Sequence, residues 1–361
     1  MSDRIFMKGN EAIAEAAVRA GCRFYAGYPI TPQNEIPEYF ARRMPEVGGV
    51  FMQGESEIAS CNMVYGAACA GTRCMTSSSS CGIALKSEAI AWLAASSLPA
   101  VICNVSRGGP GIGAIQPAQQ DYNQATKASG NGGFRMLVLA PSTVQEAVDM
   151  TYAAFDYADK YSKPVLLLID GFIGAMMEPV VLPPMKSDEE LAAIRESKKS
   201  WLPLGKKGGK VHNVLGGVGL SKLRLQDLNV KDAELYEQWK QDETEYETIN
   251  MDDAEYVITG YGTSARIAGS AMRILRSEGV KVGLIRPKKL FPFPTEAFAQ
   301  LDYSKIKGIL SVEMSIPAQY VEDVKNVVAG RCPIETSLRS GGEIIERDDI
   351  LDAARKMFCA K

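Results

Sequence analysis

Short apolar runs alternate with helical patterns along most of this chain, and this alternation constrains the fold more than any other feature. The clearest runs span residues 101–105, 136–140 and 165–169. Between the last two, Thr143 and Glu146 have the spacing of a helix capping box, and apolar residues follow with a helical period. Because a strand, a helix and a strand in this order are typical of a parallel sheet covered by helices, we expect an α/β fold.

The N-terminal part shows the same pattern. Residues 10–20 have a helical period, and residues 23–25 form a short apolar run. Thr31-Pro32 has the form of a helix start, with threonine as the N-cap and proline at the first helical position.

The composition changes after Pro183-Pro184. The chain then becomes heavily charged, is broken by glycine pairs and is only weakly periodic, so we interpret this part as an excursion or a long linker. A second α/β pattern follows, with apolar runs at 256–260, 280–285 and 307–313 and a helical pattern over 264–277. We therefore predict two domains and a linker, in the order 1–185, 186–254 and 255–361.

Composition excludes several classes of function. The single histidine, His212, rules out a histidine-centred triad or a multi-histidine metal site within this chain. A net charge of −3 gives no support to a nucleic-acid or anionic-membrane partner. The eight cysteines form no CxxC motif, so we expect buried thiols and no metal site in this chain. The longest uncharged stretch, 89–105, contains Pro99 and is better explained as a helix, a turn and a strand than as a membrane span. We expect a cytoplasmic protein.

Candidate anion-binding residues follow two of the predicted strands. If Thr31 caps a helix, its hydroxyl and the helix N-terminus would together stabilise a substrate carboxylate, although a plain structural cap is the commoner use of Thr-Pro. Arg107 comes shortly after the strand 101–105 and precedes a glycine-rich loop. Arginine suits bidentate carboxylate binding, but glycine loops also recur without a ligand.

Two further segments offer a carboxylate and a run of hydroxyls. Glu57 opens a stretch of small and apolar residues. Its commoner role is that of a first-turn carboxylate stabilised by the helix dipole, and its functional alternative is a hydrogen bond to a ring nitrogen of an organic cofactor. The serines at 77–80 precede a predicted helix over 84–95 and could present hydroxyls and backbone N–H groups to a ligand. They lack the base that a serine nucleophile requires.

Taken together, these segments resemble one family. The stretches YPITPQNEIPEY, QGESEIASCNMVYGAACAG, TSSSSCGIALK and NVSRGGPGIG are similar to the α subunit of 2-oxoacid:ferredoxin oxidoreductases, and VKVGLIRPKKLFPFP is similar to its second domain. The resemblance implies a thiamine-diphosphate-binding domain of the pyrimidine type, followed by a transketolase C-terminal-like α/β domain. Among these subunits the chain most resembles those acting on 2-oxoisovalerate, and next those acting on 2-oxoglutarate.

The resemblance also implies roles for individual residues. Glu57 matches the glutamate that bonds the aminopyrimidine of the cofactor and favours the tautomer that lets the cofactor act as its own base. Thr31 and Arg107 match the groups that hold the 2-oxoacid carboxylate. Contacts with the cofactor are expected from Tyr28, Pro29, Ile30, Glu57, Ser79 and Ser80. The chain departs from its relatives at Cys81 and Ala84, where they usually have proline and serine.

Partners follow from what the chain lacks. The resemblance places the diphosphate and Mg²⁺ side of the site on a β subunit and the [4Fe–4S] clusters on partner subunits, with γ and ferredoxin-like subunits completing the complex. Coenzyme A is the expected co-substrate, and soluble ferredoxin the expected electron acceptor. Two alternatives stay open at this point: a 2-oxoglutarate enzyme, and a non-catalytic scaffold or regulatory subunit.

Overall fold

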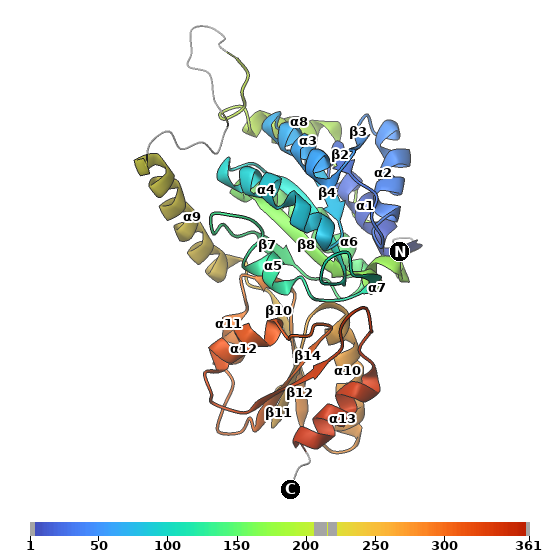
Figure 1. The fold of residues 1–361 in the computed structure, drawn as a ribbon, viewed down its shortest axis with the longest axis vertical. Helices are drawn as coiled ribbons and strands as arrows, with labels where there is room; N and C mark the ends of the chain where they lie inside the picture. Colours follow the sequence, from blue (N-terminus) through green and yellow to red (C-terminus); the bar gives the residue numbers. More distant parts are fainter. Residues whose placement is uncertain (1–3, 206–214, 216–221, 359–361) are drawn as a thin grey trace.

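The computed structural model describes residues 4–205, 215 and 222–358, so His212 lies outside the described residues. Two α/β bodies lie one above the other, with the C-terminal body at the bottom of Figure 1. Within the described ranges, no helix combines the length and the apolar character needed to cross a membrane.

The larger sheet has the strand order β13-β7-β8-β5-β4-β2-β3, with β6 paired to β5. All pairings along this path are parallel except that of β13 with β7. The strands are β2 (Phe24–Gly27), β3 (Val50–Gln53), β4 (Cys74–Ser78), β5 (Ala100–Gly108), β6 (Ala114–Pro117), β7 (Leu137–Leu139), β8 (Pro164–Asp170) and β13 (Lys289–Phe291).

Helices cover both faces of this sheet because its central strands are apolar on both sides. In β5, Val101, Cys103 and Val105 pack with the helices α1 (Gly9–Arg19), α2 (Glu35–Glu46) and α6 (Val144–Tyr161). The intervening Ile102 packs on the opposite face, with α3 (Glu57–Cys69) and α4 (Cys81–Ala95). Figure 1 shows α3 and α4 side by side in front of the sheet. Smaller elements complete this body: β1 (Ile5–Lys8), α5 (Tyr122–Thr126), α7 (Gly171–Ala175), β9 (Met177–Val180) and α8 (Asp188–Ser197).

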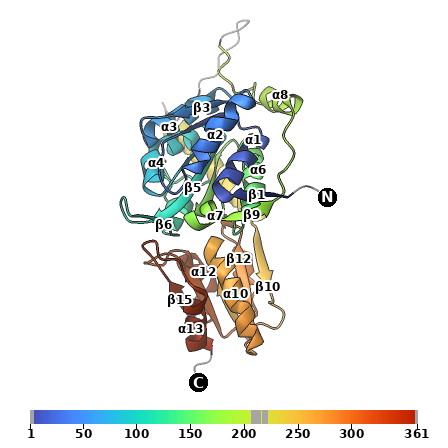
Figure 2. The same cartoon turned by 90° about the vertical axis from the view of Figure 1, so that its right-hand side faces the viewer.

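The second sheet has the order β10-β12-β11-β14-β15 and is parallel except for β10. Its strands are β10 (Tyr246–Ile249), β11 (Tyr256–Thr259), β12 (Val282–Pro287), β14 (Gly308–Glu313) and β15 (Ile334–Leu338). The helices of this body are α10 (Gly262–Ser277), α11 (Thr295–Ala299), α12 (Tyr320–Val328) and α13 (Arg347–Phe358), whereas α9 (Lys222–Asp242) lies beside the first body. The β5–β6 hairpin reaches towards this body in Figure 2, and a Cβ on Gly108 would lie 2.8 Å from the backbone of Gly341.

The expected α/β fold is confirmed, and so are the strands predicted in both bodies. Thr143 caps α6 as expected, but the capping box is incomplete. Glu146 accepts instead from the backbone N–H of Ser142 and from Arg286, which draws its carboxylate away from the cap.

One other prediction is wrong. Thr31 does not cap a helix: residues 31–34 form a turn, and α2 starts at Glu35 with Asn34 as its N-cap. The segment 186–254, interpreted from the sequence as an excursion or a linker, contains packed elements: β10 pairs with β12, and the side chain of Trp239 is buried in the core of the first body. The domain boundary at 185 stays a prediction.

Candidate active site

The segments singled out in the sequence meet at one edge of the larger sheet. β5, β4, β2 and β3 are neighbours and run in parallel, so their carboxyl ends lie together. Arg107 lies near the end of β5, Ser79 and Ser80 follow β4, the Tyr28 loop follows β2, and Glu57 comes shortly after β3. Ligands of open α/β sheets bind at this edge.

Arg107 connects the Tyr28 loop to the start of α4. Its Nη1 donates to the carbonyl oxygen of Thr31 at 2.8 Å, and its Nη2 donates to the carbonyl of Ile112 at 2.7 Å and to Cys81 Sγ at 3.2 Å. The side chain is buried, yet Nε has no partner within the described chain. Two of the five N–H groups of this guanidinium are thus left for a ligand.

Glu57 is the first residue of α3, after the N-cap Ser56, whose hydroxyl accepts from the backbone N–H of Ala59 at 3.2 Å. The glutamate is only 6% exposed, and no hydrogen bond from the described residues reaches its carboxylate oxygens. Its Oε1 lies against Gly82: a Cβ at that position would stand 2.9 Å from Oε1 and 2.1 Å from Ser78 Oγ. Glycine therefore leaves room for this carboxylate at the start of α4.

The two serines after β4 differ in their environments. Ser80 Oγ donates to Asp121 at 2.6 Å and accepts from the backbone N–H of Arg107 at 3.0 Å, so its hydroxyl already has partners within the chain. The Ser80 backbone has a φ of 31° and is held by Asn104, whose Oδ1 accepts from the Ser80 N–H. Ser79 is fully buried, and its hydroxyl has no partner among the described residues.

A buried polar chain supports the loop that contains Tyr28, Pro29 and Ile30. The Tyr25 hydroxyl and Ser77 Oγ are 2.6 Å apart, and Ser77 donates to Gln33 Oε1. Gln33 Nε2 in turn donates to the carbonyl of Tyr28. Burial raises the pKa of Tyr25, so its hydroxyl remains protonated in this chain. Tyr28 and Pro29 are exposed, so this loop presents two ring side chains at its surface.

Unpartnered buried atoms at this edge indicate that a polar ligand fits here. The hydroxyls of Ser78, Ser79 and Ser106 and the Nε of Arg107 are buried without a hydrogen-bond partner in the described chain. Such groups are rare in folded proteins unless water or a ligand satisfies them. With the Glu57 carboxylate beside Gly82, they form a donor and acceptor set suited to an aminopyrimidine ring and a substrate carboxylate.

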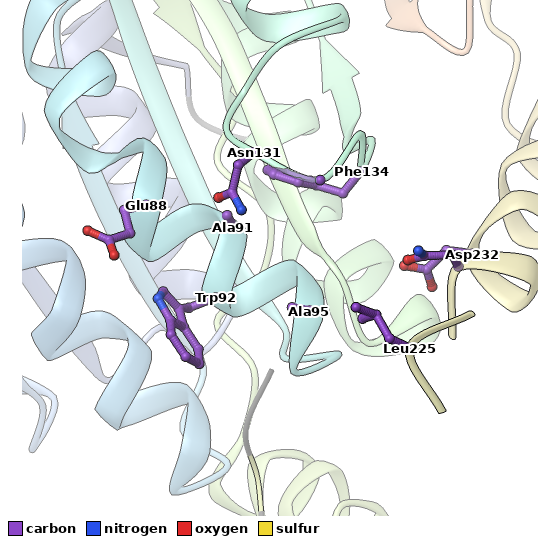
Figure 3. A pocket seen from close by; sticks show the side chains of 10 residues that line it. Glu88, Ala91, Trp92, Ala95, Asn131, Phe134, Leu225 and Asp232 are labelled. Atoms are coloured by element: carbon purple, nitrogen blue, oxygen red, sulfur yellow. The ribbon is translucent and has the colours of Figure 1, made fainter. Parts of the chain in front are cut away.

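A pocket of about 360 Å³ lies elsewhere, between α4 and α9 (Figure 3). Glu88 and Trp92 of α4 and Leu225 and Asp232 of α9 are among its lining residues. Neither Glu57 nor Arg107 lines it, so we do not place the active site there.

Comparison with known proteins decides the family. The model of the pyruvate flavodoxin/ferredoxin oxidoreductase thiamine-diphosphate-binding domain matches residues 15–214, and that of the pyruvate:ferredoxin oxidoreductase core domain II matches residues 254–350. The chain belongs to the 2-oxoacid:ferredoxin oxidoreductase family.

Individual members of this family match over nearly the whole length. The ketoisovalerate oxidoreductase subunit VorB of Methanothermobacter thermautotrophicus is 44% identical, covering 97% of this chain and 97% of that protein. The 2-oxoglutarate synthase subunit KorA of Methanothermobacter marburgensis is 33% identical, covering 98% of each. The structure of the 2-oxoglutarate:ferredoxin oxidoreductase of Magnetococcus marinus, with 2-oxoglutarate, coenzyme A and succinyl-CoA bound, aligns with a TM-score of 0.85 at 25% identity. It covers 99% of this chain and 66% of that one.

In this 2-oxoacid:ferredoxin oxidoreductase subunit, several residues at the site escaped the sequence analysis. Asn104 and Asp121 hold the Ser80 backbone and hydroxyl, and Gly82 makes room for Glu57. Lys86, which the sequence offers only as a candidate cation for a second substrate carboxylate, lies buried behind Glu57. The signal for Lys86 in the sequence is its spacing from Ile83 and Ile90, which places it on the same face of the helix as these two apolar residues. A lysine on such a buried face is rare.

Proposed function

We propose that this chain is the α subunit of a thiamine-diphosphate-dependent 2-oxoacid:ferredoxin oxidoreductase that acts on a branched-chain 2-oxoacid of the 2-oxoisovalerate type. The reaction converts the 2-oxoacid and coenzyme A into an acyl-CoA and CO₂ and passes a pair of electrons to ferredoxin. The observation behind the proposal is the meeting of Thr31, Glu57 and Arg107 at one sheet edge.

Each residue has a distinct task in this proposal. Glu57, buried beside Gly82, accepts a hydrogen bond from the aminopyrimidine ring and fixes its orientation. Arg107 uses its remaining N–H groups to hold the substrate carboxylate beside Thr31, and the Ser79 hydroxyl is available to the cofactor. Tyr28, Pro29 and Ile30 form the loop against which the cofactor rests. When bound, thiamine diphosphate supplies the nucleophilic carbon and accepts the electrons that decarboxylation leaves behind.

Partner chains complete the site in this proposal. A β subunit provides the diphosphate side with Mg²⁺, and partner subunits of the γ and ferredoxin-like types hold the [4Fe–4S] clusters. The family similarity to subunits of multi-subunit oxidoreductases supports this division. We also propose that the complex works in the cytoplasm.

The positions of two cations favour a branched-chain substrate over 2-oxoglutarate, whose second carboxylate requires a second positive group. Arg73 precedes β4, at the end of the strand opposite to Ser79, and pairs with Asp156 and Asp159. Lys86 is fully buried and donates to hydroxyl and carbonyl groups of this chain. The greater identity to the ketoisovalerate subunit supports the same choice.

A substrate comparison tests the proposal. The chain is coexpressed with its β subunit and the other partner subunits, purified without oxygen and assayed with 2-oxoisovalerate, 2-oxoglutarate and pyruvate in the presence of coenzyme A and a viologen dye. We expect the highest kcat/KM with 2-oxoisovalerate. Preference for 2-oxoglutarate would refute the substrate, and an assembled complex without turnover on any of these acids would support a scaffold.

A further inference from the structure

Lys86 is a fully buried lysine that the proposed reaction does not use. It lies on α4, is 0% exposed, and faces α3 and the sheet. Lysine is almost never fully buried unless it is paired. Within the described chain, however, no carboxylate forms an ion pair with its ammonium group.

Oxygen atoms of two elements surround this ammonium group. Lys86 Nζ donates to Ser60 Oγ at 2.6 Å, to Thr76 Oγ1 at 2.9 Å and to the carbonyl oxygen of Glu57 at 3.4 Å. Ser60 Oγ also donates to the Glu57 carbonyl, at 3.0 Å. The ammonium group is thus fixed against the first turn of α3, which begins with Glu57.

The same contacts extend to the strand that precedes the Tyr28 loop. Thr76 lies on β4, and its hydroxyl donates to the carbonyl of Ala26 on β2 at 2.7 Å. Lys86 therefore connects α4, the start of α3 and, through Thr76, the end of β2. Displacing this one side chain would loosen the positions of Glu57 and of the loop together.

The charges around Lys86 are few. The titratable groups acting on it are Glu57 and the Cys61 thiol, both on α3, whereas β4 contributes only the Thr76 hydroxyl. Burial lowers the pKa of Lys86 to about 8, and the two α3 groups partly oppose this shift. Glu57 is thus the carboxylate whose charge interacts most directly with this buried ammonium group.

We propose that Lys86 is a positioning residue for Glu57: its ammonium group fixes the first turn of α3 and thereby holds the Glu57 carboxylate in place towards the cofactor. This inference rests on the proposed function. Lys86 itself touches neither substrate nor cofactor, since it lies behind the turn that presents Glu57.

The test replaces Lys86 with methionine, which has a similar length and no charge, in the complete complex. We expect kcat to fall by roughly 10-fold to 100-fold because Glu57 is displaced. The KM for the 2-oxoacid should change less than about twofold, because Arg107 is untouched. Thiamine diphosphate should bind about tenfold more weakly, as measured by quenching of tryptophan fluorescence.

The pH profile separates positioning from simple stabilisation of the fold. In the unmodified enzyme, deprotonation of Lys86 should produce a loss of kcat above about pH 8. Lys86→Met should lack this basic limb.

Lys163→Met is the matched control. Lys163 is also buried, but its ammonium group binds Asp232 and the carbonyl of Ala94, away from Glu57. This variant should lower thermal stability and leave the basic limb of the pH profile in place. The inference is wrong if Lys86→Met keeps the basic limb and a kcat within about twofold of the unmodified enzyme, or if Lys163→Met changes the profile equally.

A second variant covers the case in which Lys86→Met does not assemble. Ser60→Ala removes the shortest Lys86 contact but keeps the charge, so kcat should fall while the basic limb persists. An unchanged kcat in this variant would overturn the positioning role. Loss of turnover in the unmodified complex would instead contradict the proposed function, and cofactor binding by the Lys86 and Ser60 variants would still test the inference.

Discussion

Replacing Arg107 with alanine tests the proposed substrate site most directly. Two N–H groups of the guanidinium have no partner in the described chain, and the side chain is only 5% exposed. Hydrogen bonds to charged groups contribute about 1.5–3 kcal/mol each. Loss of two such bonds to a carboxylate should therefore raise the KM for the 2-oxoacid by roughly 100-fold or more.

The assay is steady-state reduction of a viologen dye by the anaerobic complex, with 2-oxoisovalerate varied at saturating coenzyme A. Arg107→Ala also leaves the carbonyls of Thr31 and Ile112 without a donor, so thermal unfolding and copurification of the β subunit are measured alongside. Arg107→Lys keeps the charge and should give an intermediate KM, and added guanidinium ion should partly restore Arg107→Ala. Arg42→Ala, on the surface of α2, is the control and should change KM less than about twofold.

A KM close to that of the unmodified enzyme in an assembled Arg107→Ala complex would refute the assignment. In that case the three contacts that Arg107 makes to Thr31, Ile112 and Cys81 would be its whole role. A fall in kcat with no change in KM would also count against carboxylate binding, since it would place the effect in the chemical step.

Three further predictions follow from the same structure. Glu57→Gln should lower kcat by at least about 100-fold without impairing assembly with the β subunit, and an active variant would remove Glu57 from its role. Gly82→Ala should lower kcat with little change in KM, because the added Cβ would stand 2.1 Å from Ser78 Oγ and displace Glu57; an unchanged kcat would show that the turn adapts. Trp239→Ala should destabilise the protein by about 3–5 kcal/mol in denaturant unfolding, because its side chain is almost fully buried, whereas a change below about 1 kcal/mol would show that α9 contributes little.

The sequence predicts the strands well because β5, β7 and β8 are covered on both faces. Such strands are continuous apolar runs, and no tertiary information is needed to recognise them. The parallel order of the strands explains why the candidate site residues come together. Once the strands are parallel neighbours, residues that follow them share an edge of the sheet.

The start of α2 could not be predicted from local rules. A threonine before a proline is a good helix cap in isolation, but here the Thr31 carbonyl accepts a hydrogen bond from Arg107, which is 76 residues further along the chain. The carbonyl that accepts this hydrogen bond lies in the turn of residues 31–34, which precedes the first residue of α2, Glu35. The local capping preference is therefore overridden by a tertiary contact that no spacing in the sequence reveals.

The packing of the charged segment could not be predicted for a different reason. The described part of α9 is mostly exposed, and Trp239 anchors it, buried near Tyr161 and Phe291 with Leu235 and Tyr236 packed beside it. A few apolar residues among charged neighbours give little periodic signal, although burying Trp239 contributes as much as burying several smaller side chains. The weak hydrophobic periodicity of α9 therefore does not reveal that this helix packs on the first body.

The shortage of histidine initially argues against catalysis, but the site explains it. The proposed chemistry requires from this chain a carboxylate for the cofactor ring, a cation for the substrate carboxylate and hydroxyls for the remaining polar atoms. Glu57, Arg107 and Ser79 meet these needs, and none of the three tasks requires a histidine, the side chain whose ordinary pKa is closest to neutral pH. Two residues that position this site, Asn104 at Ser80 and Lys86 at the first turn of α3, act through backbone atoms and hydroxyls, and therefore leave no motif in the sequence. Sequence can thus identify the groups facing a ligand, whereas the contacts that fix their geometry emerge only when the chain is folded.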